Sequence, residues 1–161
     1  MGASRVVHLP CAPASVAVAR RALSEELRAV GIFDHAVSDA ALVISELLSN
    51  AILHAYPLPG EVLQVTWAVR AASVELAVSD GGSATTPHAE HPSPSATGGR
   101  GLRIVEDLSQ TWGVRAEEAG LTVWAVLLAP RYRHDGDGSA AAGSALAAAA
   151  WSRQPDPRTS R

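Results

Sequence analysis

Hydrophobic residues recur along the chain with two different periods, and these periods predict where helices and strands lie. Apolar residues spaced by three and four positions predict helices over residues 13–30, 34–55 and 102–108. Apolar residues at every second position predict strands over residues 5–9, 61–70, 74–80, 111–116 and 121–128. The last strand is apolar on both faces except at Thr122, so we expect it to lie in the interior of a sheet.

The predicted helix over residues 34–55 carries polar side chains on the side opposite its main apolar stripe. At about 100° per residue, Glu46, Asn50 and His54 fall within roughly 80° of arc, with apolar residues on either side of them. Buried polar groups are costly without partners, so this row indicates either a pocket with a polar occupant or a stripe that faces solvent. Asn50 has a carbonyl oxygen suited to Mg²⁺, Glu46 is able to orient or deprotonate a hydroxyl, and we interpret His54 as a packing residue.

A carboxylate emerges from the apolar face of the predicted strand over residues 74–80. Val74, Leu76 and Val78 share one face, and the same alternation places Asp80 on it. Asp80 is able to accept a hydrogen bond from an exocyclic amine, and Gly82 lets a flat ring lie against the backbone. An ordinary Asp-Gly turn is the alternative interpretation.

A glycine-rich segment, Gly98-Gly99-Arg100-Gly101, precedes the predicted helix over residues 102–108. The free N–H groups of a first helical turn, together with the helix dipole, favour an anion such as phosphate. Glycines also begin helices for steric reasons, so this signal has a second interpretation. The segment is not a P-loop, because the chain has no lysine, and it follows a proline-containing connection rather than the strand that a Rossmann fingerprint requires.

Composition limits the classes of protein to which the chain can belong. It has 161 residues, 47% of them hydrophobic and 18% charged, which predicts a single globular domain. A formal charge of −3 without a basic cluster argues against direct nucleic-acid binding, and Cys11, the only cysteine, cannot form an intrachain disulfide. No apolar run approaches the ~20 residues of a membrane span and no signal-peptide pattern is present, so we expect a cytoplasmic protein without a membrane partner.

The composition changes after Pro130. We predict a folded domain over residues 1–130 and an Ala/Gly/Pro-rich tail over residues 131–161, with a short helix over 144–151. The tail has no core pattern, so we expect it to contribute little to stability.

Three of these segments together resemble the nucleotide-binding boxes of the GHKL (Bergerat-fold) ATPases. The boxes are Glu46-x-x-x-Asn50, Asp80-x-Gly82 and Gly98-Gly99-Arg100-Gly101-Leu102. The segments Trp112-Gly113-Val114 and Gly120-Leu121-Thr122-Val123-Trp124 are similar to the stand-alone anti-sigma-factor serine kinases of high-GC Gram-positive bacteria. The resemblance covers about residues 5–128.

The resemblance implies an α/β (α+β) two-layer sandwich, in which helices cover one face of a mixed, mostly antiparallel sheet. It implies ATP and Mg²⁺ as cofactors, with Glu46 as the catalytic base and Asn50 as the metal ligand. In this pattern Asp80 contacts the adenine amine, Gly82 passes under the ring and Thr122 supports the adenine end. The nucleotide-binding residues carried over by position are Asn50, Asp80, Gly82, Gly98, Gly99, Arg100, Gly101, Leu102 and Thr122.

The function implied by the resemblance is that of an ATP-dependent protein serine/threonine kinase. Such a protein phosphorylates a STAS-domain anti-anti-sigma partner and also binds a sigma factor; a homodimer is left open. A non-catalytic ATP-binding regulatory module is the alternative, favoured by the absence of lysine from the connection before the glycines. The catalytic half of a histidine kinase is disfavoured, because no helical hairpin with a phospho-acceptor histidine precedes the boxes.

Overall fold

The computed structural model describes residues 4–83 and 99–132, and these residues form the elements that the two periods predict. In chain order the elements are β1 (Ser4–Pro10), α1 (Ala14–Ala29), α2 (Asp34–His54), β2 (Val62–Val69), β3 (Ser73–Asp80), α3 (Gly99–Leu108), β4 (Thr111–Glu117) and β5 (Gly120–Leu128). The main difference from prediction is that α3 begins at Gly99, so the glycines form its first turn. The predicted helix over residues 144–151 lies outside the described residues.

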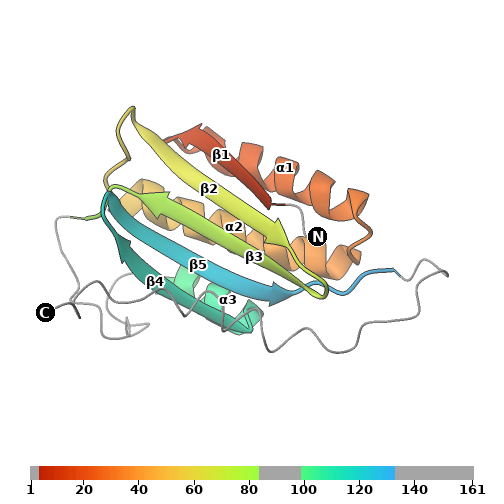
Figure 1. Cartoon of the computed structure of the whole chain (residues 1–161). Coiled ribbons are helices and arrows are strands. Elements are labelled where there is room, and N and C mark those ends of the chain that lie inside the picture. Colours follow the sequence, from red (N-terminus) through yellow and green to blue (C-terminus); the bar gives the residue numbers. More distant parts are fainter. Residues whose placement is uncertain (1–3, 84–98, 133–161) are drawn as a thin grey trace, which may run out of the picture.

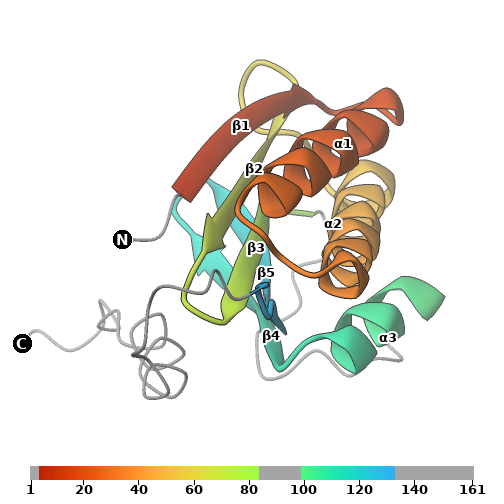
Figure 2. The same cartoon turned by 90° about the vertical axis from the view of Figure 1, so that its right-hand side faces the viewer.

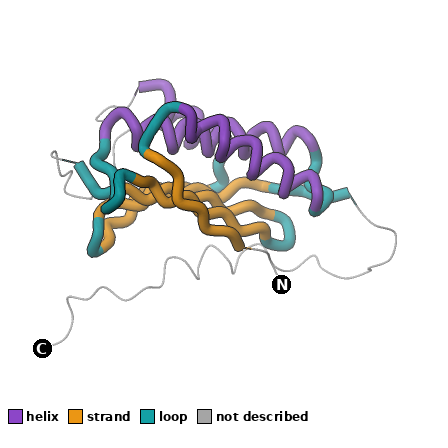
Figure 3. Tube along the Cα trace, turned by 90° about the horizontal axis from the view of Figure 1, so that it is seen from above, coloured by secondary structure: helices purple, strands orange, loops and turns teal. Residues whose placement is uncertain are grey.

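The strands form one sheet in the order β1-β2-β3-β5-β4 (Figure 1). Every neighbouring pair is antiparallel, so the described sheet contains no parallel pair. All three described helices lie on one face of this sheet, as Figure 3 shows, which confirms the predicted two-layer sandwich. β5 lies between β3 and β4, in the interior position that its apolar sequence predicts.

α2 is the central helix of the covering layer, with α1 on one side and α3 on the other (Figure 2). Its buried residues are Ala36, Val37, Ala40, Val43, Ile44, Leu47, Leu48 and Ala51. By length and composition alone α2 is able to cross a membrane, which differs from the expectation that no apolar run is long enough. In the structure these residues pack within the hydrophobic core of the sandwich, so the apolar character of α2 is explained by burial.

The two faces of the sheet differ in what covers them. Antiparallel register pairs Val65 with Val78 and Trp67 with Leu76, and all four side chains belong to the core beneath the helices. The alternate residues point to the opposite face, which we call the open face because no described helix lies on it (Figure 3). Which face a strand residue occupies therefore decides whether it can take part in a site beneath the helices.

Candidate nucleotide-binding site

The end of α2 is joined to the end of β3 by backbone hydrogen bonds. The Tyr56 N–H donates to the Gly82 carbonyl at 2.8 Å, and the Gly81 N–H donates to the Tyr56 carbonyl at 2.7 Å. Gly81 leaves no room for a side chain, because a β-carbon there would lie 2.3 Å from the Pro57 carbonyl oxygen. This junction brings the first two boxes, which are far apart in sequence, to the same end of the molecule.

Asp80 is a buried carboxylate held by backbone groups. Asp80 is only 5% exposed, and its Oδ1 accepts a hydrogen bond from the Gly82 N–H at 2.7 Å. Burial raises the pKa of Asp80, and hydrogen bonds from the backbone N–H groups of Gly82 and Leu121 partly offset that rise. Gly82 has a φ of +90°, which glycine adopts readily and which makes this turn back toward the carboxylate possible. The result is a fixed acceptor at the end of β3.

Glu46 lies against the first turn of α3. A β-carbon placed on Gly101 would be 2.6 Å from Glu46 Oε2, so only glycine allows this approach without displacing the carboxylate. This turn contains no acidic residue, and its N–H groups form the positive end of the helix. The first and third boxes are thus in contact through α2 and α3.

Comparison with protein families matches residues 9–127 to the histidine kinase-like ATPase domain. The chain belongs to this family. The match confirms the resemblance to the GHKL ATPases, and ATP is the ligand that an ATPase domain of this kind implies. No curated protein matches the chain.

The ATPase domain also resembles a solved structure, that of the RsbU and RsbW domains of Rv1364c from Mycobacterium tuberculosis. The TM-score is 0.62 with 21% sequence identity, and the similarity covers 80% of this chain. It covers 32% of the other chain, so the ATPase domain spans about a third of that protein's length. At this identity the similarity supports the fold.

Thr122 is not on the same face of the sheet as Asp80. Register pairs Asp80 with Leu121 and Ser79 with Thr122, which places the Thr122 side chain on the open face. The expected support of the adenine end by Thr122 therefore stays a prediction, and its hydroxyl lies on the face opposite the Asp80 side chain. Thr122 was assigned to the site only from its position in the sequence resemblance, and a shift of one residue along a strand moves a side chain to the other face of the sheet. Leu121 occupies the position across from Asp80 and contributes its backbone N–H.

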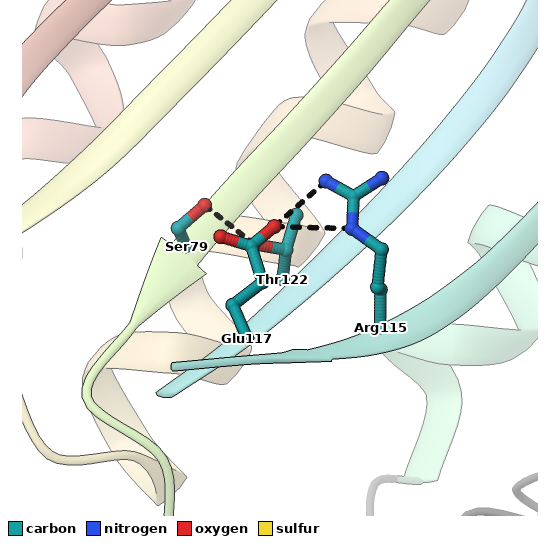
Figure 4. A network of polar contacts seen from close by, with 4 residues as sticks. All are labelled: Ser79, Arg115, Glu117 and Thr122. Atoms are coloured by element: carbon teal, nitrogen blue, oxygen red, sulfur yellow. Dashed lines mark hydrogen bonds and ion pairs between the residues drawn. The ribbon is translucent and has the colours of Figure 1, made fainter. Parts of the chain in front are cut away.

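Thr122 instead belongs to a polar network on the open face (Figure 4). Its hydroxyl lies 2.7 Å from the Ser79 hydroxyl and donates to Glu117 Oε1 at 2.9 Å. The same carboxylate oxygen accepts from Arg115 Nη2 at 2.7 Å, and this guanidinium lowers the pKa of Glu117. The network links β3, β5 and β4 at the end of the sheet nearest Asp80.

The remaining predicted residues are placed as follows. Asn50 is partly buried on α2, one turn after Glu46. His54 is exposed at the end of the same helix, so the interpretation of His54 as a packing residue is wrong. Arg100 is exposed, and Leu102 is 7% exposed, so its side chain anchors the turn in the protein interior. Gly98 lies outside the described residues.

The described residues contain no cluster of three or more His, Cys, Asp and Glu side chains able to hold a metal ion. Asn50 by itself offers one neutral oxygen, a donor set that suits Mg²⁺ only when phosphates supply further ligands. The residues present therefore fit a metal that arrives with a nucleotide rather than one resident in the protein.

A groove of about 740 Å³ between α1 and α2 was not predicted from the sequence. It is lined by arginines of α1 (Arg20, Arg21 and Arg28) and extends to Glu46. The available signal was the recurrence of arginine along the polar side of the predicted first helix. These arginines line a groove only because α2 packs beside α1, and the sequence pattern does not reveal that packing.

Proposed function

We propose that this ATPase domain is a protein serine kinase of the anti-sigma-factor type. It transfers the γ-phosphoryl group of ATP to a serine of a STAS-domain anti-anti-sigma partner, and it binds a sigma factor in the cytoplasm. The observation that carries the proposal is the contact between Glu46 and the first turn of α3, which sets a carboxylate beside a helix end suited to phosphate. The segments that resemble the anti-sigma-factor kinases, and the fold shared with an RsbW-containing structure, support the same branch.

Each end of the nucleotide has a counterpart in the site. Asp80 accepts a hydrogen bond from the adenine amine, and Gly82 leaves space for the ring beside the backbone. The N–H groups of the first turn of α3 bind the phosphates, and Asn50 is the protein ligand of Mg²⁺. Mg²⁺, when bound, would supply positive charge that stabilises the phosphates during transfer.

Glu46 accepts the proton of the incoming serine hydroxyl. A bond forms between the serine oxygen and the γ-phosphorus while the bond from that phosphorus to the bridging oxygen breaks, so ADP is the leaving group. A positioned general base typically contributes about 10²- to 10⁴-fold to the rate. The groove between α1 and α2 extends to Glu46 and gives a protein chain a route to this carboxylate.

A non-catalytic regulatory module is the second candidate. One observation favours it: the chain has no lysine, and the basic residue of the glycine segment, Arg100, is exposed. A module of this kind binds ATP and changes its choice of partner without transferring phosphate.

Phosphorylation with radiolabelled ATP and a panel of STAS-domain proteins separates these functions. We expect the wild type to label one STAS protein on serine, and Glu46→Gln to bind ATP normally but label it at least ~100-fold more slowly. Glu106→Gln is the matched control, because Glu106 is exposed on α3 and does not line the groove that leads to Glu46. Tight ATP binding without labelling of any STAS protein establishes the regulatory module instead.

A further inference from the structure

The open face of the sheet carries polar side chains at most positions, but its middle contains two alanines. Ala77 of β3 lies between Thr66 of β2 and Trp124 of β5, and Ala68 lies one pair further along β2. An antiparallel sheet with one solvated face usually shows polar residues at such positions. Each alanine contributes only a methyl group, so the surface of the sheet is low at this point.

The Trp124 side chain lies over β4 and leaves space on its other side. Trp124 pairs with Gly113, and a β-carbon added to Gly113 would lie 2.9 Å from Cζ2 and 3.3 Å from Nε1 of the indole. The ring therefore extends over the glycine, whereas Ala77 is on the opposite neighbour of β5. Small residues on β2 and β3, together with a large ring that leans toward β4, produce a hollow in the open face.

A cavity of about 50 Å³ occupies this hollow. The side chains that line it include Thr66, Ala68, Arg70, Glu75, Ala77 and Trp124. A cavity needs roughly 10–15 Å³ to hold one water molecule, so this one has room for about four. A compact group of a few heavy atoms, such as a guanidinium, has a comparable size. None of the residues proposed to bind nucleotide lines this cavity.

Glu75 places a carboxylate in the cavity. The residue is 9% exposed, and its Oε1 accepts from Arg70 Nε at 3.5 Å, which is long for a hydrogen bond. Within the described part of the chain, its buried Oε2 has no hydrogen-bond partner. The Arg70 side chain is itself 40% exposed, so solvent screens its charge. A buried carboxylate oxygen without a donor is costly, so a ligand that brings one is favoured here.

The groups around the cavity favour a cation that carries N–H groups. A carboxylate forms its strongest hydrogen bonds with charged donors, and the Thr66 hydroxyl is able to accept a further N–H. The indole of Trp124 attracts a cation placed within about 6 Å of its ring. An anion would be repelled by Glu75, and an apolar group would leave Oε2 without a donor.

We propose that this cavity binds a guanidinium or primary ammonium group. Glu75 Oε2 accepts its N–H groups, Trp124 forms one wall, and the two alanines form the floor. A free small cation and the side chain of an arginine or lysine present the same group, so the site recognises the group whatever molecule carries it. The cavity lies on the face that the described helices leave open (Figure 3), away from Glu46, so the inference is independent of the proposed kinase activity.

Titration of the full chain with three probes, followed by heteronuclear NMR, tests the proposal. Methylguanidinium has both a charge and N–H donors, urea has the donors without the charge, and tetramethylammonium has the charge without the donors. At constant ionic strength, we expect only methylguanidinium to shift the Trp124 indole N–H signal in a saturable way. The spectrum of Trp124→Phe identifies that signal.

Two variants test the lining of the cavity. Glu75→Gln keeps the size of the side chain and removes its charge, so it should weaken methylguanidinium binding at least ~10-fold. Its melting temperature should not fall, because the variant no longer buries an unpaired carboxylate. Ala77→Leu should abolish binding by filling the hollow while Glu75 is retained. Glu118→Gln is the matched control, because Glu118 is exposed in the β4–β5 turn and does not line the cavity.

Equal binding of methylguanidinium to the wild type and Glu75→Gln overturns the proposal, and a lower melting temperature of that variant then gives Glu75 a structural role. Equal binding of urea or tetramethylammonium also overturns it, because the charge or the N–H donors are then not required. If no probe saturates, water alone fills the cavity and the proposal is wrong. A capped glycine-arginine-glycine peptide distinguishes the carriers: tighter binding than methylguanidinium supports the site with a protein ligand, and weaker binding supports it with a free small cation.

Discussion

A single methyl group at Gly101 should displace the proposed catalytic carboxylate. A β-carbon at this position lies 2.6 Å from Glu46 Oε2, whereas ordinary van der Waals contact begins at 3.4 Å. In Gly101→Ala the oxygen must therefore retreat by 3.4 − 2.6, or about 0.8 Å. The contacted atom is the end of a flexible side chain, so we expect Glu46 to move rather than the backbone of α3.

A displacement of about 1 Å from the reactive geometry costs roughly 100-fold in rate, and we expect Gly101→Ala to slow phosphoryl transfer by about that factor. Unfolding would not explain the loss, because replacing glycine by alanine within a helix stabilises it by up to ~1 kcal/mol. ATP affinity should change much less than the rate, since the N–H groups of the turn are retained. The melting temperature and calorimetric ATP titrations check these two conditions.

The assay compares the wild type, Gly101→Ala, Glu46→Gln and the double variant as a double-mutant cycle. If the methyl group acts through Glu46, the double variant transfers phosphate no more slowly than Glu46→Gln alone. Gly113→Ala is the control for the substitution itself, because its β-carbon would meet Trp124 on the open face. Wild-type rates in Gly101→Ala refute the reasoning, and so does a further hundredfold loss in the double variant.

Three other substitutions test the rest of the site. Asp80→Asn should lose a charge-assisted hydrogen bond of about 1.5–3 kcal/mol, roughly ten- to hundredfold in ATP affinity by calorimetry; unchanged affinity removes Asp80 from the site. Burial raises the pKa of Asp80 above 3.8, so the ATP affinity of the wild type should fall as the pH drops through that raised pKa. The ATP affinity of Asp80→Asn should not change over the same pH range. If the affinities of both proteins change with pH in the same way, another group is responsible for the titration. Asn50→Ala should weaken ATP binding mainly with Mg²⁺ present, and an equal loss in EDTA makes Asn50 a structural residue. Thr122→Val should lower the free energy of unfolding by about 1–3 kcal/mol and leave ATP affinity intact, whereas lower affinity at unchanged stability would return Thr122 to the pocket.

Local patterns in the sequence were sufficient for the secondary structure and for part of the site. The periods of 3.6 and 2 follow from the geometry of a helix and a strand, so they predict elements without knowledge of neighbours. The same alternation correctly placed Asp80 on the covered face of the sheet. The order of the three boxes was enough to identify the ATPase family, which the match over residues 9–127 confirms.

The tertiary structure alone decided features that depend on which segments pair. Thr122 faces away from Asp80 because the β3–β5 register pairs it with Ser79, and no local pattern in β5 reveals its partner strand. The approach of Glu46 to Gly101 depends on how α2 packs against α3. Burial at the open face likewise became visible only when Ala68 and Ala77, small residues on different strands, were found to line the same cavity. In each case the deciding contact joins residues distant in sequence, where periodicity along one segment carries no information.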